Sequence, residues 1–377
     1  MKKNDGSEKV DMLAEAREAQ WSALTFMGED TVKAIAPAKV NLFLAVGRKG
    51  NDGYHEVVTA MHALALHDVL YFTCNESSEN ANDASEDSME QKHAEENDST
   101  AFAGPGGCIK VHIEVVDKTH VSGIGASSHL RGAVPDIPIK QNLVFKAIDS
   151  LAHELGISRD QEVSVRIEKN IPTHARLGGA STDASVTLLA MCDFWGSSDS
   201  GPSIHKVAAS LGADVSFFLK GGCGIFTGRG EAFERVLVPM KHPVVIVRPH
   251  EGVSTKEAYS KFDENPIKVP AELLARVEDA SDADQIPLYN NLQPIACELL
   301  PEVGRIVDWL RDRAHLDSHT DVSDEELSSN VLMSGSGSAV FAVVDTYADA
   351  TNIAADAAKQ GWWSRATTFS SLRAAVL

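Results

Sequence analysis

The stretch from Glu168 to Ser185 combines residue types that suit a bound phosphate. It reads EKNIPTHARLGGASTDAS and contains a proline, a Gly-Gly pair and a Ser-Thr-Asp cluster. Small residues let a backbone approach an anion, and the first N–H groups of a helix point at it with the positive end of the helix dipole. The spacing is neither GxGxxG nor GxxxxGK[ST], so neither a dinucleotide fold nor a P-loop is indicated. Phosphate binding and an ordinary structural turn are both open on this stretch alone.

The flanking residues predict a strand before this stretch and a helix after it. Apolar residues alternate with polar ones over 163–167, which is the period of a half-buried strand. Apolar residues then recur at helical spacing over 186–191, and the Ser-Thr-Asp cluster could cap that helix. The stretch is therefore predicted to be a loop that leads from a strand into a helix N-terminus.

Other polar residues that could do chemistry lie far from this loop in the sequence. A hairpin is predicted near the start of the chain, because strand patterns flank the turn signal Asn51-Asp52-Gly53. Polar groups near its strand ends are Lys39, Asn41, Tyr54 and His55. Each of them taken singly also fits a surface or capping role. Asp214 stands just before an apolar segment, where it is either a helix cap or a positioned base.

Composition excludes several classes of partner. The 377 residues are 43% hydrophobic and 23% charged, which is ordinary for a globular protein of two domains or one large domain. The formal charge of −20 argues against nucleic acid and anionic membranes as partners. The five cysteines form no CxxC pair, which fits reduced thiols in a cytoplasmic protein and gives no zinc signal. We find neither a signal peptide nor an apolar run long enough for a membrane span, and the sequence does not indicate an oligomeric state.

Two acidic segments interrupt an otherwise ordinary alternation of helix and strand patterns. Residues 75–104 and 315–330 are rich in Glu, Asp and Ser with little to bury, so we expect a flexible insert and an acidic loop. Residues 1–30 are a polar extension with a helical pattern over 12–24, to which we assign no role. Between these segments the patterns predict strands near 109–116, 243–248 and 331–345, and helices near 142–155, 204–211 and 291–313. We expect an α+β architecture with a first domain over 31–240 and a second over 241–377.

Three separated motifs resemble those of the GHMP small-molecule kinases. They are PAKVNLFL near the start, the loop in the middle, and SGSGSAVF near the end. Within that superfamily, DGYHE, LGADVSFFL, GVST and NNLQP are similar to the branch whose acceptor is a methylerythritol linked to cytidine diphosphate. The resemblance covers residues 31–377 apart from the two acidic segments.

This resemblance implies a fold and a reaction. The fold has two α+β lobes with the active site in the cleft between them, and the phosphates of ATP lie at the central loop. The γ-phosphoryl group passes to the 2-hydroxyl of the cytidine-diphosphate-linked acceptor, a step in the non-mevalonate route to isoprenoid precursors. Such a transfer needs alignment and charge neutralisation, part of it from Mg²⁺ on the ATP phosphates. By the same resemblance, Asp214 accepts the proton of the hydroxyl and Lys39 holds the carboxylate in place.

The resemblance also assigns binding residues. On the acceptor side it implies Asn41, Tyr54, His55 and Tyr259, with the two tyrosines stacking on the cytosine and His55 bonding to its edge. On the ATP side it implies ten residues: Asn142, Lys169, Pro172, Arg176, Leu177, Gly178, Gly179, Ala180, Ser181 and Thr182. It implies no protein ligand for the metal ion.

The central loop departs from the family pattern at His174, Arg176 and Ala180, where glycine is expected. A side chain at a position that needs a positive φ costs about 1 kcal/mol or more. Arg176 could instead reach a phosphate oxygen, because a guanidinium group suits that geometry. Two other functions stay open. One is another GHMP kinase acting on a small alcohol such as homoserine or mevalonate. The other, suggested by the altered loop, is a nucleotide-binding relative that has lost catalysis.

Overall fold

The computed structural model describes residues 28, 30–51, 53–76, 99–103, 107–119, 137–314 and 330–377. The helical pattern expected over 12–24, most of the acidic insert (77–98) and most of the acidic loop (315–329) lie outside these residues.

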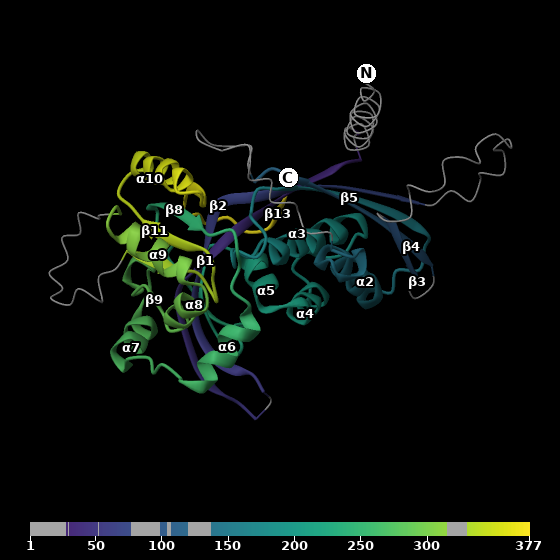
Figure 1. Cartoon of the computed structure of the whole chain (residues 1–377). Helices are drawn as coiled ribbons and strands as arrows, with labels where there is room; N and C mark the ends of the chain where they lie inside the picture. Colours follow the sequence, from purple (N-terminus) through teal and green to yellow (C-terminus); the bar gives the residue numbers. More distant parts are fainter. Residues whose placement is uncertain are drawn as a thin grey trace, which may run out of the picture.

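A nine-stranded sheet is built on one long antiparallel hairpin (Figure 1). Its two strands, β1 and β2, pair from Val32 with Phe72 to Lys49 with His55, and the chain turns between them where the sequence predicts. The sheet runs in the order β13-β1-β2-β5-β4-β3, with β6 on β2, β7 on β6 and β9 on β1. The strands are β1 (Val32–Lys49), β2 (His55–Glu76), β3 (Ser99–Ala103), β4 (Cys108–Asp117), β5 (Gln161–Lys169), β6 (Cys223–Thr227), β7 (Ala232–Leu237), β9 (Tyr289–Asn290) and β13 (Ala375–Val376).

A second, four-stranded sheet follows in the sequence, in the order β10-β11-β8-β12. Its strands are β8 (Pro243–Arg248), β10 (Val331–Met333), β11 (Val340–Val343) and β12 (Trp363–Thr368). The helices are η1 (Ile139–Gln141), α2 (Leu143–Leu155), α3 (Gly179–Phe194), α4 (Pro202–Leu211), α5 (Ala213–Lys220), α6 (Thr255–Glu264), α7 (Ala271–Asp279), η2 (Ala283–Gln285), α8 (Gln293–Leu299), α9 (Pro301–Arg311) and α10 (Tyr347–Lys359).

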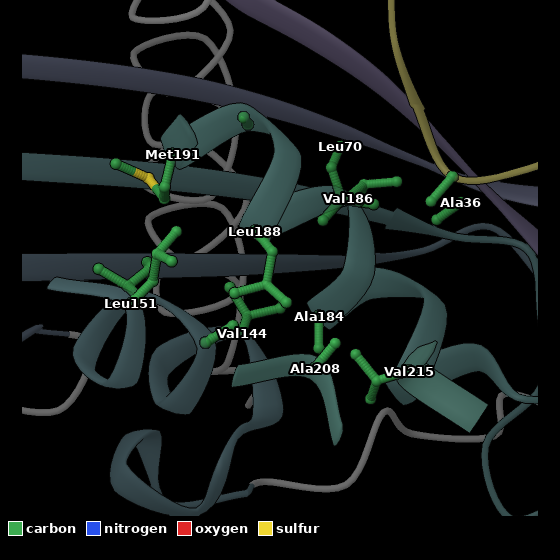
Figure 2. Close-up of a cluster of buried hydrophobic side chains, with 14 of the residues drawn as sticks. Ala36, Leu70, Val144, Leu151, Ala184, Val186, Leu188, Met191, Ala208 and Val215 are labelled. Carbon is green, nitrogen blue, oxygen red and sulfur yellow. The ribbon is translucent and has the colours of Figure 1, made fainter. Parts of the chain in front are cut away.

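Helix α3, which follows the central loop, lies at the centre of the hydrophobic core between the large sheet and its helices. Helices α2 to α5 gather on one side of the large sheet (Figure 1). Figure 2 shows Val186 and Leu188 of α3 among apolar side chains of β2, α2 and α4. Each fully buried aliphatic side chain of this kind contributes about 1.5–3 kcal/mol. Because α3 is buried on most of its surface, its position and that of its first turn are fixed by packing.

The chain after residue 240 contributes strands β9 and β13 to the nine-stranded sheet. Strand β9 pairs in parallel with β1, matching Phe43 with Tyr289, and β13 returns from the C-terminus to pair Val376 with Ala34. The side chain of Asn291 accepts from Val46 N at 2.9 Å and donates to Val46 O at 2.9 Å. The fold is the α+β architecture that the sequence predicts. The exact domain boundary at 240 stays a prediction, because the second half supplies strands to the first sheet.

Two local predictions are wrong. Residues 75–104 are not flexible throughout: Asn75 and Glu76 end β2, and Ser99–Ala103 forms β3 against β4. Composition misses β3 because its single aromatic residue, Phe102, anchors it by packing edge-on against Phe145 at 5.7 Å. The Ser-Thr-Asp cluster does not cap α3 either, since the helix already begins at Gly179 and Gly178 is its N-cap.

His62 of β2 is held as a neutral imidazole in the core. Its Nδ1 lies 2.8 Å from the carbonyl oxygen of Ala63, and its Nε2 accepts from Met240 N at 3.1 Å. One nitrogen must therefore donate while the other accepts, which only the uncharged ring can do. Burial lowers the pKa of His62 to about 4, against the opposing effect of its bond to the Ala63 carbonyl.

This depressed pKa predicts a pH dependence of stability. Between pH 6.5 and 4 the unfolded chain binds a proton that folded His62 excludes, so stability should fall as the pH falls through that window, by about 3 kcal/mol in all. His62→Gln should remove this component from the pH dependence of urea unfolding. His205→Gln, at an exposed position of α4, is the control and should keep the wild-type slope. An unchanged slope in His62→Gln would contradict the assignment.

Candidate active site

The central loop is docked on β1 through its main chain. Lys39 N donates to Leu177 O at 2.9 Å. The next residue, Gly178, has a φ of +79°, and a Cβ there would lie 2.5 Å from Phe218 Cζ and 3.1 Å from Lys39 Cγ. Only glycine fits this position, because both the backbone conformation and the close approach exclude a side chain.

The N-terminus of α3 fits an anion. The helix begins at Gly179 with no side chain capping it, and in a helix the first N–H groups, here those of residues 179–181, have no intrahelical acceptor. The Thr182 hydroxyl is fully buried, and it has no hydrogen-bond partner in the described part of the chain. Uncapped donors and a buried hydroxyl at one helix end are suited to phosphate oxygens.

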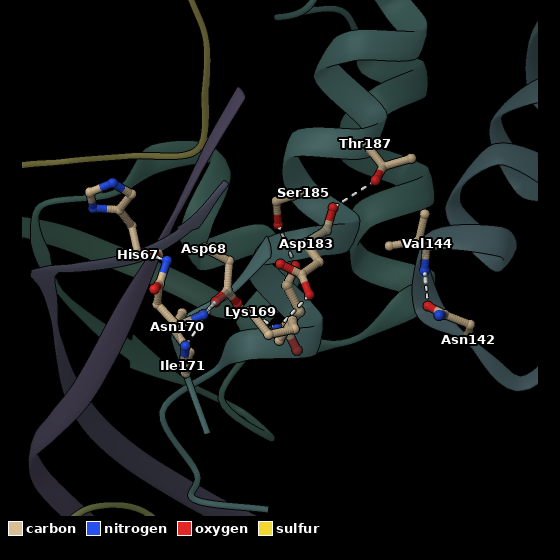
Figure 3. Close-up of polar contacts among 11 residues, drawn as sticks. His67, Asp68, Asn142, Val144, Lys169, Asn170, Ile171, Asp183, Ser185 and Thr187 are labelled. Carbon is tan, nitrogen blue, oxygen red and sulfur yellow. Dashed lines mark hydrogen bonds and ion pairs between the residues drawn. The ribbon is translucent and has the colours of Figure 1, made fainter. Parts of the chain in front are cut away.

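A buried ion cluster supports this loop from the sheet side. Figure 3 shows Asp68 of β2 and Asp183 of α3 directed at Lys169, the last residue of β5. The ammonium group donates to both carboxylates, at 2.7 Å for Asp183. Asp68 also accepts from the backbone N–H groups of Asn170 (2.5 Å) and Ile171 (2.8 Å), the first residues of the loop. The cluster thus joins β2, β5, the loop and α3.

The pKa values in this cluster reflect two carboxylates around one cation. Burial raises the pKa of Asp183 to about 7, Lys169 opposes that shift, and Asp68 adds to it. Burial alone would lower the pKa of Lys169, but Asp183 and Asp68 outweigh it and raise the value. The ammonium group therefore stays charged and engaged with both carboxylates.

Lys39 and Asp214 come together as an ion pair. Lys39 Nζ lies 3.5 Å from Asp214 Oδ2 and donates to Asn41 Oδ1 at 2.7 Å. The Lys39 side chain is 5% exposed and that of Asp214 is 34% exposed. The carboxylate is thus open to solvent while its cationic partner is enclosed. Asp214 lies in the first turn of α5, whose N-cap is Gly212, so the helix-cap alternative is wrong.

The third motif lies against the same residues. Ser334 Oγ accepts from Asn41 N at 3.2 Å and donates to Arg176 O at 3.3 Å. The Asn290 amide donates to the carbonyl oxygens of Met333 (2.8 Å) and Gly335 (2.7 Å) and so fixes this turn. The first motif, the central loop and the SGSGS turn therefore meet at Asn41 and Arg176.

A second group of predicted residues lies around His55. The ring of His55 lies 5.2 Å from that of Tyr259 in α6, between ring centroids, and its Nδ1 is 3.0 Å from Gly47 O. His55 Nε2 is 2.9 Å from Asp263 Oδ1, and Lys49 pairs with the other oxygen of Asp263 at 2.9 Å. The structure thus places His55, the first residue of β2, next to Tyr259 of α6.

Tyr54 has a different neighbour. Its side chain is exposed, and the guanidinium group of Arg229 lies 3.9 Å from the centroid of its ring. The sequence did not indicate this contact, since the two residues are far apart along the chain.

Two of the three departures in the loop occupy strained backbone. His174 has a φ of 57° and Arg176 a φ of 60°, whereas Ala180 lies in α3 with ordinary helical geometry. Arg248 of β8 donates to Thr173 O at 2.5 Å and holds the loop just before His174. The cost of a side chain at a positive φ therefore applies at positions 174 and 176 and not at 180.

The charge of Arg176 interacts with the partly exposed carboxylate of Asp214. Burial lowers the pKa of Arg176, while Asp214 and Tyr259 act in the opposite sense. Burial also raises the pKa of Tyr259, and the charge of Arg176 opposes that shift. The guanidinium group therefore interacts electrostatically with both Asp214 and Tyr259.

The remaining predicted residues have structural roles or flank the loop. Asn142 is the N-cap of α2 and accepts from Val144 N at 2.9 Å, and Pro172 is buried in the loop (Figure 3 shows the cap). Lys169 donates to two carboxylates, and a contact of its ammonium group with ATP stays a prediction.

Sequence reasoning gave no role to Asp68 or Arg229, named Ser334 only as part of the SGSGSAVF motif, and assigned Asp183 only a capping role. Asp68 carries one possible signal, because it is a lone carboxylate in the otherwise apolar ALHDVL of a buried strand.

Comparison with known proteins agrees with this arrangement. The model of the GHMP kinases N terminal domain matches residues 142–222. The chain is 32% identical to a 4-diphosphocytidyl-2-C-methyl-D-erythritol kinase of Pelotomaculum thermopropionicum, over 86% of this chain and 93% of the relative. It is also 32% identical to the kinase of the same name from Bacillus cytotoxicus, over 82% of this chain and 86% of that one.

Solved structures show the same fold. A crystal structure of 4-(cytidine 5'-diphospho)-2C-methyl-D-erythritol kinase superposes with a TM-score of 0.57 at 25% identity, covering 89% of this chain and 98% of that one. Homoserine kinase from Cytophaga hutchinsonii superposes with a TM-score of 0.58 at 17% identity, over 93% and 98% of the two chains, and supports the fold alone. The fold is that of a GHMP kinase. Within that class, the chain belongs to the family of 4-diphosphocytidyl-2-C-methyl-D-erythritol kinases.

Neither a membrane helix nor a metal cluster is found among the described residues. None of their helices combines the length and the apolar character that crossing a bilayer requires. Within the same part of the chain, no three His, Cys, Asp or Glu side chains are grouped to hold a metal ion.

The strained loop yields a stability prediction. His174→Gly should raise the free energy of unfolding by about 1 kcal/mol, because glycine adopts a φ of 57° without the clash of a Cβ. Urea denaturation measures the change. Ala180→Gly is the matched control: its backbone is already helical, so glycine should bring no gain there. Equal effects of the two substitutions would contradict strain at position 174.

Proposed function

We propose that this chain catalyses the ATP-dependent phosphorylation of the 2-hydroxyl of 4-diphosphocytidyl-2-C-methyl-D-erythritol, in the non-mevalonate route to isoprenoid precursors. The observation that supports it most is the meeting of three distant segments at Lys39. Its backbone N–H binds the phosphate loop, its ammonium group faces Asp214, and its neighbour Asn41 binds the SGSGS turn. The names of the relatives supply the identity of the acceptor.

ATP is the co-substrate of kinases of this class, and the loop offers it a phosphate site. The N–H groups at the start of α3 and the buried Thr182 hydroxyl would hold phosphate oxygens. Mg²⁺, when bound to those phosphates, would neutralise part of the charge that develops during transfer. The close fit of Gly178 against Phe218 and Lys39 fixes the position of this backbone.

The acceptor hydroxyl would lie between this site and Asp214. Asp214 would take the hydroxyl proton as the oxygen forms its bond to the γ-phosphorus and the bond to the β-phosphate oxygen breaks, releasing ADP. Lys39 would hold the carboxylate through the 3.5 Å pair and is itself fixed by Asn41. Positioning of this kind supplies most of the acceleration in phosphoryl transfer.

The cytidine end would lie at His55 and Tyr259. His55 is fixed by Gly47 O and Asp263 and is packed against Tyr259, so it offers a rigid edge and an aromatic face to a base. An acceptor such as homoserine or mevalonate has no base to occupy these groups. A relative without catalysis would have no need of the paired Lys39 and Asp214. We also infer a cytoplasmic enzyme, in keeping with five free cysteines.

Removal of the base carboxylate tests the reaction. Asp214→Asn should lower kcat for the cytidine-linked acceptor at least a hundredfold, because a positioned general base contributes about 10²–10⁴ to the rate. Its affinity for the acceptor, measured by calorimetry, should stay within a few-fold of the wild type.

Asp193→Asn, at an exposed position near the end of α3, is the control for charge loss and should leave kcat unchanged. Full turnover in Asp214→Asn would remove Asp214 from the base role, and acceptor binding without ATP consumption by the wild type would favour a non-catalytic protein.

Arg176→Gly separates strain from phosphate contact. We infer that the guanidinium group contacts a phosphate oxygen, so kcat/KM for ATP should fall at least tenfold, as a lost charge-assisted hydrogen bond predicts. The same variant should be more stable by about 1 kcal/mol, because its φ of 60° suits glycine. Unchanged kinetics with the gain in stability would show that Arg176 is only tolerated in the loop.

A further inference from the structure

The turn between β6 and β7 touches both ends of the proposed acceptor site. Val57 N, near the start of β2, donates to Gly228 O at 2.7 Å. A Cβ on Gly230, whose φ is +101°, would lie 3.7 Å from Ala213 Cβ and 3.7 Å from Val57 Cγ2. The turn is therefore packed between the strand that begins at His55 and the helix that carries Asp214.

Arg229 at the tip of this turn covers one face of Tyr54. Its guanidinium carbon lies 3.9 Å from the ring centroid, well within the range of a cation–π contact. The backbone of Arg229 is itself fixed, since its N–H donates to Glu231 Oε2 at 2.7 Å. Tyr54 is 57% exposed, so much of its surface is open to a ligand.

We propose that Arg229 is a positioning residue for the acceptor's base, which holds the Tyr54 ring by covering one face and leaves the opposite face for the cytosine. The inference rests on the proposed function, because it takes Tyr54 as the ring on which the base stacks. A ring fixed before binding loses less conformational freedom when the base arrives, so the contact favours the acceptor and not ATP. The ligand class that it selects is a pyrimidine nucleoside diphosphate.

A double-mutant cycle tests the coupling. Steady-state kinetics would compare wild type, Arg229→Gln, Tyr54→Leu and the double variant, with Mg-ATP and the cytidine-linked acceptor. Arg229→Gln should raise the KM for the acceptor about two- to five-fold and leave kcat and the KM for ATP unchanged. In the Tyr54→Leu background the same substitution should change nothing further.

Lys220, the last residue of α5, provides a matched control through its contact with Phe233 of β7. Its ammonium group lies 4.2 Å from the ring centroid of Phe233, so Lys220→Gln also removes a cation–π contact. That contact involves none of the proposed acceptor residues, and its loss should leave the KM for the acceptor unchanged.

The outcomes separate this inference from the function on which it rests. An equal effect of Arg229→Gln with and without Tyr54, or an effect confined to kcat or to ATP, would overturn the positioning role. Affinity for cytidine 5'-diphosphate, measured by calorimetry on the same four proteins, should follow the same pattern. If the wild type binds this probe with the coupling but does not phosphorylate the acceptor, the proposed function fails and the positioning role stands.

Discussion

The ammonium group of Lys169, buried between Asp68 and Asp183, fixes the geometry of the central loop. It ties the end of β5 to α3, and Asp68 extends the link to the first two backbone N–H groups of the loop. Ionisable groups are expensive to desolvate, and removing one partner of such a cluster commonly costs about 3–5 kcal/mol. The cluster is therefore better understood as a device that specifies one position for the loop than as a source of net stability. The start of α3 can stay uncapped because the cluster and the packing of α3 hold it.

Contacts from the four-stranded sheet and from the SGSGS turn stabilise the strained backbone of the loop. His174 and Arg176 both have a positive φ, and each is held by a contact from the second half of the chain. Arg248 binds the carbonyl oxygen before His174, and Ser334 binds the carbonyl oxygen of Arg176. Because these contacts come from elements next to the SGSGS turn, the same interactions that stabilise an unfavourable backbone also bring the third motif to Asn41. The conformation of the loop and the position of the third motif therefore depend on the same contacts.

The sequence predicts the parts of this site that depend on local pattern or on a motif. The hairpin follows from Asn51 to Gly53, the helix after the loop follows from the apolar spacing over 186–191, and the pairing of Lys39 with Asp214 follows from the resemblance. Contacts between distant residues that carry no motif were not predictable. Asp68 joins Lys169 across 101 positions, and nothing near Tyr54 points to Arg229. Strand β3 was missed because composition averages over a segment, whereas one packed aromatic residue decides its structure.

We propose that the site around Lys39, Asp214 and His55 selects an acceptor that carries a cytidine diphosphate. The most direct measurement is ADP release by the wild-type protein with Mg-ATP and equal concentrations of the cytidine-linked methylerythritol, homoserine or mevalonate in parallel. We expect turnover only with the cytidine-linked acceptor, and free cytidine 5'-diphosphate should inhibit it competitively. Turnover of homoserine or mevalonate at a comparable kcat/KM, or no inhibition by cytidine 5'-diphosphate, would contradict the account.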